Sequence, residues 1–358
     1  MIDAEPVSAL SQARTVRACG LEMAADGAWP ERQWLLFRQS GVTAWTIPRD
    51  YGGFGFSADD VLDGCIELAR ADLVSTFVLS QFQSACSRFF ASTNSDLSRV
   101  WLPALALGDA FATVGISHLT TSRQHVSRPT VLAQPVAGGF RLTGEIPWVT
   151  SGFKADILVA GAALDDGRQI LFALPTNRPG VEIAPGWPLL ALTGSSTGPV
   201  RLAGVEITEG DLLAGPIDRV LQQGHPGGAG SLTTSALALG HAFHCVDRIR
   251  LESEQRPALL EIVQAFEQDL NQLRSDLLAS SRGVAGPDHT ADSLRTRATS
   301  QALATSQSLL TATKGAGFVA GHPAERLARE AMFFLVWSCP QAVSSRLLRE
   351  FSQCEAGL

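Results

Sequence analysis

The spacing of apolar residues changes twice along the 358-residue chain, and this change restricts the fold more than any other feature. Residues 1–109 repeat apolar positions at helical spacing. Residues 110–215 contain short apolar runs separated by turn residues, which is typical of strands. Residues 216–358 return to long segments rich in Ala and Leu. This order predicts an α+β multidomain protein with an N-terminal α-helical domain, a central β-domain and a C-terminal helical bundle.

Two hairpin signals stand in the central part of the chain. The paired runs are Val131–Val136 with Phe140–Thr143, and Ile157–Ala160 with Ile170–Leu174. The glycine pair Gly138-Gly139 separates the first two runs, and Asp165-Asp166-Gly167 separates the second two. Several short strands joined by such turns predict a small barrel or a sandwich.

Long helices are predicted for three C-terminal segments. They are Leu232–Leu251, Pro257–Ser281 and Ser293–Leu310. The second segment carries apolar residues on more than one face: Leu259, Leu260, Ile262, Val263 and Phe266. A helix that is apolar on several faces requires burial on several sides, and two-fold dimers are the commonest assemblies. We therefore expect a dimer at least, unless other helices of the same chain cover these faces.

Composition argues against several classes of partner. The net charge is −7 and no Lys/Arg-rich run is present, so nucleic acid and anionic membranes are poor candidates. The first residues lack the features of a signal peptide, and no apolar stretch reaches the roughly 18 residues of a membrane span. Six widely spaced cysteines without a CxxC pair argue against zinc and against disulfides, which predicts no metal site and a cytoplasmic location.

Four stretches match the motifs of one enzyme family. Pro48–Gly55 reads as P-x-x-Y-G-G-x-G, Glu67–Asp72 as the helix after it, Gly144–Gly152 as a variant of G-x-K-x-W-I-T-N-G, and Gly315–Glu330 as a variant of G-x-G-Y…P-x-E-R-x-x-R-D. In this order and spacing, the chain resembles the acyl-CoA dehydrogenase family over nearly its whole length. The resemblance implies the family's N-terminal helices, central β-domain and C-terminal four-helix bundle. It also implies FAD, a small-molecule substrate such as an acyl-CoA, and a homodimer or homotetramer.

The resemblance places Ser117, Trp148 and Thr150 against the flavin ring. A hydroxyl or N–H donor near the pyrimidine end stabilises the negative charge of a reduced flavin, and an indole face packs against the ring. On the residues alone, Trp148 fits a core aromatic and Thr150 a turn residue better than flavin contacts. The flavin-contact roles therefore depend on the resemblance.

Gly315 and Gly317 precede a helix that is expected to begin at Pro323. Glycine backbone beside a helix start allows a phosphate to approach closely, and the family uses this region for the dinucleotide half of FAD. Lys314 stands where the family has Gly and could pair with a pyrophosphate. The alternative is an ordinary turn between helices with a solvated Lys314.

The glutamate that serves as catalytic base in the family is missing. The register from Arg329-Glu330 places Ser338 at its position, and the site that some members use instead falls near Gly230. A serine hydroxyl is far too weakly basic to replace a carboxylate. The resemblance places His118 at the flavin edge, where an imidazole could act as the base. The alternative for His118 is a structural hydrogen bond within a loop.

Two further departures leave the reaction open. The stretch Ser117–Arg123 replaces the family's T-E-P-G-A-G-S-D loop, which puts CoA recognition in doubt. The stretch after Asp247 lacks the F-G of the R-x-x-F-G segment that contacts a partner's FAD, so FMN remains an alternative. Three functions follow: a flavin-dependent oxidoreductase of an acyl-thioester-like substrate with a non-standard or absent base, a flavin-dependent monooxygenase of the same fold, or a catalytically inactive paralogue with a structural or regulatory role.

Overall fold

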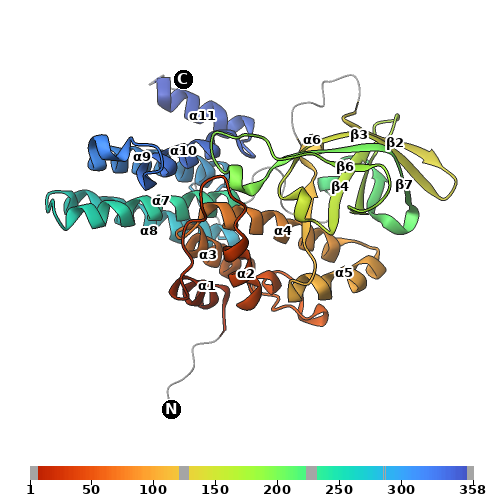
Figure 1. The fold of residues 1–358 in the computed structure, drawn as a ribbon, viewed down its shortest axis with the longest axis horizontal. Helices are drawn as coiled ribbons and strands as arrows, with labels where there is room; N and C mark the ends of the chain where they lie inside the picture. Colours follow the sequence, from red (N-terminus) through yellow and green to blue (C-terminus); the bar gives the residue numbers. More distant parts are fainter. Residues whose placement is uncertain (1–6, 121–128, 223–231, 285, 287, 353–358) are drawn as a thin grey trace, which may run out of the picture.

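Helices and a single β-sheet occupy different sides of the molecule (Figure 1). The computed structural model describes residues 7–120, 129–222, 232–284, 286 and 288–352. Along the chain, helices come first, then the sheet, then helices again. This order confirms the expected α+β architecture, with helices on both sides of a central β-part in the chain. Gly230, and the part of the Ser117–Arg123 stretch that follows Thr120, lie outside the described residues.

The N-terminal part is helical, as predicted. It contains α1 (Ala9–Ala18), α2 (Glu31–Gln39), the short 3₁₀ turns η1 (Val42–Ala44) and η2 (Arg49–Tyr51), α3 (Ala58–Ala69), α4 (Leu73–Ala91) and α5 (Ser95–Leu107). Asp72 caps α4, because its carboxylate accepts the N–H of Ser75 at 2.8 Å. The same carboxylate accepts the N–H of Ala24 at 3.0 Å, which ties the start of α4 to the segment after α1.

The segment between α2 and α3 is the compact loop that Pro48 and its neighbouring glycines predict. The N–H of Phe54 donates to the carbonyl of Ala44 at 2.9 Å and folds the loop back onto η1. A Cβ at Gly53 would lie 1.9 Å from the carbonyl oxygen of Ile47. Only glycine therefore fits at this position of the motif.

The central part is one eight-stranded sheet. Its strands are β1 (Ala112–Gly115), β2 (Val131–Val136), β3 (Gly139–Val149), β4 (Ile157–Ala163), β5 (Gln169–Pro175), β6 (Val181–Ile183), β7 (Gly198–Thr208) and β8 (Leu212–Ile217). The order is β6-β7-β3-β2-β4-β5-β8, with β1 parallel to β4. Both predicted hairpins are confirmed, as β2–β3 and β4–β5. Because β2 also pairs with β4, the hairpins join one sheet and do not form the two sheets of a sandwich.

The C-terminal part contains the expected bundle. After the short helix α6 (Ser117–Thr120) and the sheet come α7 (Leu232–Ser253), α8 (Leu259–Ser281), α9 (Ala291–Gly317), α10 (Pro323–Val336) and α11 (Gln341–Ser352). Helices α7 to α10 pack on one another beside the N-terminal helices (Figure 1). α9 continues beyond the predicted end at Leu310, since no Gly or Pro interrupts the chain before Gly315.

The apolar residues of α8 divide between the interior and the surface. Val263 is fully buried, and Leu259 and Phe266 are partly buried against the core. Leu260 and Ile262 are 41% and 44% exposed. Helices of the same chain therefore cover one face of α8 and leave a second face exposed. Within the described ranges, no helix combines the length and the apolar character that a bilayer crossing needs.

A buried ion pair fastens α10 to the N-terminal part. The guanidinium of Arg326 donates to the carboxylate of Glu330 at 2.7 Å and to the carbonyl of Ala24, and it lies 3.8 Å from the carboxylate of Asp72. Arg326 and Glu330 are only 7% and 2% exposed. Burial raises the pKa of Glu330 to about 7, and the cation of Arg326 opposes this shift. The E-R-x-x-R motif therefore has a structural role here.

Arg329 joins α10 to the other two parts of the chain. Its guanidinium pairs with Glu325 and with Asp26, each at 2.7 Å, and donates to the carbonyl of Leu190 at 3.0 Å. Leu190 lies between β6 and β7, and Asp26 lies between α1 and α2. One turn of α10 thus contacts the N-terminal helices and the β-part together.

Replacing Arg326 with Met should destabilise the protein strongly. The substitution would leave Glu330 and Asp72 buried without their cation, which typically costs about 3–5 kcal/mol of unfolding free energy. Arg201 is the control, because it forms only long surface contacts to Glu145 and Glu182 at 65% side-chain exposure. R201M should change the free energy by about 1 kcal/mol or less. Urea unfolding of both variants measures the difference, and equal small changes would contradict a structural role for Arg326.

Candidate active site

A cavity of about 770 Å³ lies where the three parts of the chain meet. Residues of α3, α4, α7, β1 and β3 and the ends of α8 and α10 line it. It brings together three residues predicted from the sequence, namely Ser117, Trp148 and Ser338. Its volume lies in the range of small-molecule sites. We take this cavity as the candidate active site.

The sheet presents Ser117 and Trp148 to the cavity. Ser117 begins α6 shortly after the end of β1. Trp148 lies one residue before the end of β3 and is 43% exposed, whereas Ile146 and Val149 are buried in the core of the sheet. The pairing of β3 with β7 changes register between Ile146 and Val149. Such an irregularity re-aims a side chain, and here it turns the indole of Trp148 out of the sheet core.

The end of α10 presents Ser338. The guanidinium of Arg295 donates to the carbonyls of Phe334 and Trp337 at 2.9 and 2.8 Å, which fixes the last turn of α10. The indole of Trp337 stacks on the ring of Phe333 at 5.4 Å between centroids. Ser338 follows this turn with a φ of 43°. Ser338 therefore faces the cavity, and its assignment to the position of the family's glutamate stays a prediction from the resemblance.

No acid or imidazole lines the cavity among the residues that the structure describes. Arg88 is the one charged side chain in that lining. Cys339 follows Ser338, but burial raises the pKa of its thiol, with Arg295 opposing the shift. The described walls thus contain no group able to remove a proton from carbon near neutral pH.

Thr150 has a hydroxyl partner within the protein. It is 2% exposed, and its hydroxyl lies 2.9 Å from the hydroxyl of Thr197, which in turn lies 2.8 Å from that of Ser195. Thr150 is not among the described residues that line the cavity. Its role as a flavin contact stays a prediction.

His118 is directed at the sheet. Its Nε2 lies 3.0 Å from the carbonyl oxygen of Gly161 on β4, and because a carbonyl only accepts, Nε2 carries the proton. Burial lowers the pKa of the imidazole, so His118 is neutral. Nδ1 is buried without a partner among the described residues, and His118 is absent from the described lining of the cavity. The geometry matches a structural hydrogen bond, and a catalytic role stays a prediction.

Lys314, Gly315 and Gly317 lie away from the cavity. They end α9, with Lys314 at a φ of 54°, and α10 then begins at Pro323 as expected. The cavity contacts the opposite end of α10, which has 14 residues and therefore spans about 21 Å. Within one chain, these residues and Trp148 do not form one site. Their proposed contact with a dinucleotide stays a prediction that requires a second chain.

A polar row on α4 was not found from the sequence. Ser80, Ser84, Ser87 and Arg88 line the cavity, together with Gln83. Their spacing of three and four residues places the serines on one face of an otherwise apolar helix. The sequence analysis considered only the apolar positions of α4. The serines that repeat at helical spacing between them were the signal that could have indicated a polar face. These polar residues become part of a candidate site only because the folded chain places them beside the cavity.

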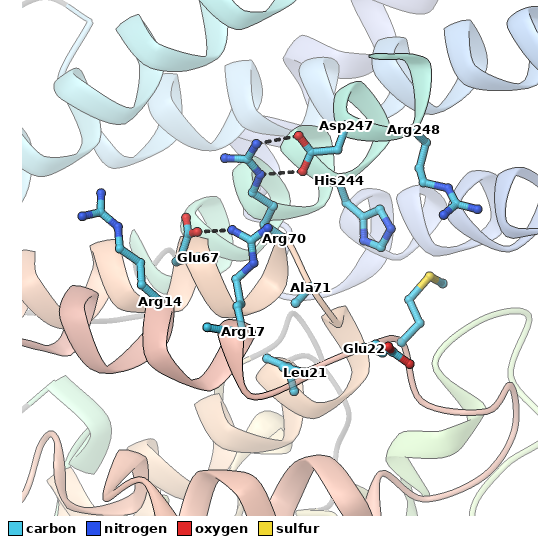
Figure 2. Close-up of a pocket in the computed structure, with 12 residues that line it drawn as sticks. Arg14, Arg17, Leu21, Glu22, Glu67, Arg70, Ala71, His244, Asp247 and Arg248 are labelled. Atoms are coloured by element: carbon cyan, nitrogen blue, oxygen red, sulfur yellow. Dashed lines mark hydrogen bonds and ion pairs between the residues drawn. The ribbon is translucent and has the colours of Figure 1, made fainter. Parts of the chain in front are cut away.

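A second pocket, of about 930 Å³, lies between α1, α3 and α7 (Figure 2). It contains four arginines, but Arg17 pairs with Glu67, and Arg70 pairs with Asp247 through two hydrogen bonds (Figure 2). Burial lowers the pKa of His244 in this pocket to about 4, and the cation of Arg248 adds to the shift. Because carboxylates already neutralise part of its charge, this pocket is a weaker candidate for a ligand site.

The sequence is similar to those of two groups of enzymes. It is 29% identical over 198 residues to isobutylamine N-hydroxylase from Streptomyces viridifaciens, which covers 51% of this chain and 50% of that protein. It is 26% identical over 179 residues to a probable acyl-CoA dehydrogenase of Bacillus subtilis, which covers 48% of this chain and 29% of that protein. The chain thus spans half the length of these relatives or less. No protein-family profile matches it.

Solved structures cover the whole chain at lower identity. Butyryl-CoA dehydrogenase from Megasphaera elsdenii superposes with a TM-score of 0.81 at 17% identity, covering 98% of this chain and 100% of that one. Dibenzothiophene monooxygenase from Paenibacillus sp. A11-2 superposes with a TM-score of 0.76 at 18% identity, covering 98% and 97%. The protein is acyl-CoA dehydrogenase-like in sequence and in fold. This acyl-CoA dehydrogenase-like fold hosts both named reactions, so residues of the site must distinguish them.

Proposed function

We propose that the protein is a flavin-dependent oxidoreductase that holds the flavin ring in this cavity. The half-exposed indole of Trp148 offers a flat aromatic face to a ring. Thr46 Oγ1 lines the same cavity and is buried without a hydrogen-bond partner among the described residues. A buried hydroxyl of this kind is suited to a polar ring edge. These residues therefore fit the cofactor that the fold family implies.

Oxygenation is the reaction that the cavity supports best. Dehydrogenation of a thioester requires a base for the α-proton, and the described lining contains neither a carboxylate nor an imidazole. In flavin-dependent oxygenation, one atom of dioxygen enters the substrate and the other leaves as water, with two electrons from the reduced flavin. No carbon acid has to be deprotonated. The names isobutylamine N-hydroxylase and dibenzothiophene monooxygenase, among the similar proteins, describe reactions of this class.

A second copy of the chain completes the proposed cofactor site. Gly315 and Gly317 lie at the far end of α10 from the cavity, so we infer that they hold the dinucleotide half of a flavin whose ring lies in the cavity of a second chain. The exposed apolar residues Leu260 and Ile262 on α8 support a contact between C-terminal bundles. We therefore include a homodimer or a homotetramer in the proposal.

A cytoplasmic location and a small-molecule substrate complete the proposal. The described cysteines are free thiols, with Cys65, Cys86 and Cys245 buried and Cys19 exposed. Reducing compartments keep thiols in this state. The volume of the cavity, about 770 Å³, supports a small molecule beside the flavin ring.

The purified protein should bind FAD or FMN, and Trp148→Ala should weaken that binding about 5- to 20-fold, because an aromatic stacking partner is lost. Trp187→Ala is the matched control, since Trp187 is 44% exposed against 43% for Trp148 but lies outside the described lining of the cavity. Titration followed by flavin fluorescence measures both. A protein that binds neither flavin would refute the proposed function.

Under anaerobic conditions, butyryl-CoA and octanoyl-CoA should not bleach the flavin-loaded protein, because Ser338 replaces the base. A proton-transfer residue typically contributes a factor of ~10²–10⁴, so Ser338→Glu should raise the bleaching rate by about that factor if a thioester binds. Ser338→Gln, of the same length without a carboxylate, should not. Rapid bleaching of the unmodified protein would assign it to thioester dehydrogenation.

Light scattering at micromolar concentration should give at least twice the mass of one chain, which is 38.0 kDa. Ile262→Glu should lower that mass, because it places a charge on the exposed apolar face of α8. Leu35→Glu is the control, since Leu35 is similarly exposed, at 48%, on α2. A mass of one chain for the unmodified protein would exclude the dimer and the shared cofactor site.

A further inference from the structure

Arg88 is a buried cation without an anion. It lies in the last turn of α4 and is 9% exposed. Its guanidinium has neither a hydrogen bond nor an ion pair within the described parts of the chain. Burial lowers its pKa, and no carboxylate acts to raise it. A guanidinium stays protonated in proteins, so a buried charge of this kind costs stability unless something pairs with it.

The other two buried arginines of the described chain show what a paired cation looks like here. Arg326 pairs with Glu330, and Arg295 donates to the carbonyls of Phe334 and Trp337. Both are as deeply buried as Arg88, at 7% and 1% exposure. Arg88 differs because its guanidinium faces the cavity and not a protein acceptor. A partner from outside the chain is the simplest way to satisfy it.

Gln83, on another side of α4, offers a second donor to the cavity. Its Oε1 accepts from the thiol of Cys65 at 3.8 Å, while its Nε2 is buried without a partner among the described residues. The hydroxyl of Ser87 donates to the carbonyl of Gln83 at 2.9 Å, so its proton is already used within α4. The Nε2 of Gln83 and the guanidinium of Arg88 are both N–H donors, and each requires an acceptor.

We propose that Arg88 binds the carboxylate of a small-molecule substrate in the cavity. This assignment names the substrate class of the proposed function, and the identification of the carboxylate ligand as a substrate rests on that function. One guanidinium balances the single charge of a carboxylate and can donate to both of its oxygens. A phosphate dianion fits less well, because Arg88 stands at the C-terminal end of α4, where the helix dipole is negative.

The rest of the wall indicates the body of the ligand. Phe77, Leu237, Phe333 and Trp337 line the cavity and are apolar or aromatic. A ligand that satisfies both kinds of wall has an apolar body and one anionic end. Aliphatic or aromatic carboxylic acids have this form, whereas the isobutylamine of the N-hydroxylase is a cation that Arg88 would repel.

Matched pairs of probes test the assignment. Hexanoate is compared with hexanamide, and benzoate with benzamide, because each pair has nearly the same size and shape, whereas the amide lacks the negative charge and replaces one acceptor oxygen with an NH₂ donor. Calorimetry on the flavin-free and on the flavin-loaded protein should show the carboxylates binding about 10- to 100-fold more tightly than the amides. Arg88→Gln should abolish the preference and Arg88→Lys should retain part of it. Arg99→Gln, an exposed arginine paired with Asp96, is the control that should change nothing.

The thermal unfolding midpoint shows whether a variant loses carboxylate binding because it is misfolded. Since ligand-free Arg88 is an unpaired buried charge, Arg88→Met should raise the unfolding midpoint of the ligand-free protein by about 2–4 °C. It should also remove the further rise that benzoate gives the unmodified protein. A fall in the midpoint, or an unchanged response to benzoate, would count against an unpaired cation that binds carboxylates.

The outcomes separate this inference from the proposed function. Carboxylate preference that depends on Arg88 in a protein that binds no flavin would uphold the anion site and refute the flavin enzyme. Equal binding of carboxylates and amides would overturn the anion site while leaving the flavin proposal intact. If Arg88→Gln instead weakens flavin binding tenfold or more and carboxylates bind no better than amides, Arg88 belongs to the cofactor, and the assignment to substrate is wrong.

Discussion

The buried pair of Arg326 and Glu330 is the contact on which the position of the C-terminal bundle against the N-terminal helices depends. Arg326 also reaches Ala24 and lies near Asp72, the residue that caps α4. A buried ion pair tolerates little displacement, because each charge loses its water and needs its partner in return. Helix α10 is therefore held in a defined position relative to the start of α4. Both helices line the cavity, together with α3, α7, the end of α8 and the sheet.

That fixed frame sets the chemistry of the cavity through what it places on the walls. Arg295 holds the last turn of α10, so Ser338, which the resemblance assigns to the position of the family's acid, faces the cavity. α4 contributes Arg88 as the one charge on the described walls. A cavity with a cation and without a base does not support removal of a proton from carbon, but it favours an anionic ligand. Oxygenation of a carboxylate-bearing substrate satisfies both conditions.

Much of the fold was predictable because its signals are local. Both hairpins follow from runs of strand residues around Gly138-Gly139 and Asp165-Asp166-Gly167, and these signals need no distant contact. Ser117, Trp148 and Ser338 were found through motifs and do share one cavity. The side chains of His118 and Thr150 instead bond to Gly161 and Thr197, residues more than forty positions away that no pattern connects with them.

The sequence by itself determined the order of helices and strands, the resemblance that assigns the fold, and the identity of Ser338 where a carboxylate would be needed. Those features are carried by local periodicity and by residue type. Only the tertiary structure decided which polar side chains have partners. Arg88, Arg295 and Arg326 are the same amino acid and are all buried, yet one is unpaired, one caps a helix end and one forms an ion pair. The physical reason is that burial and pairing are set by neighbours that are distant in the chain.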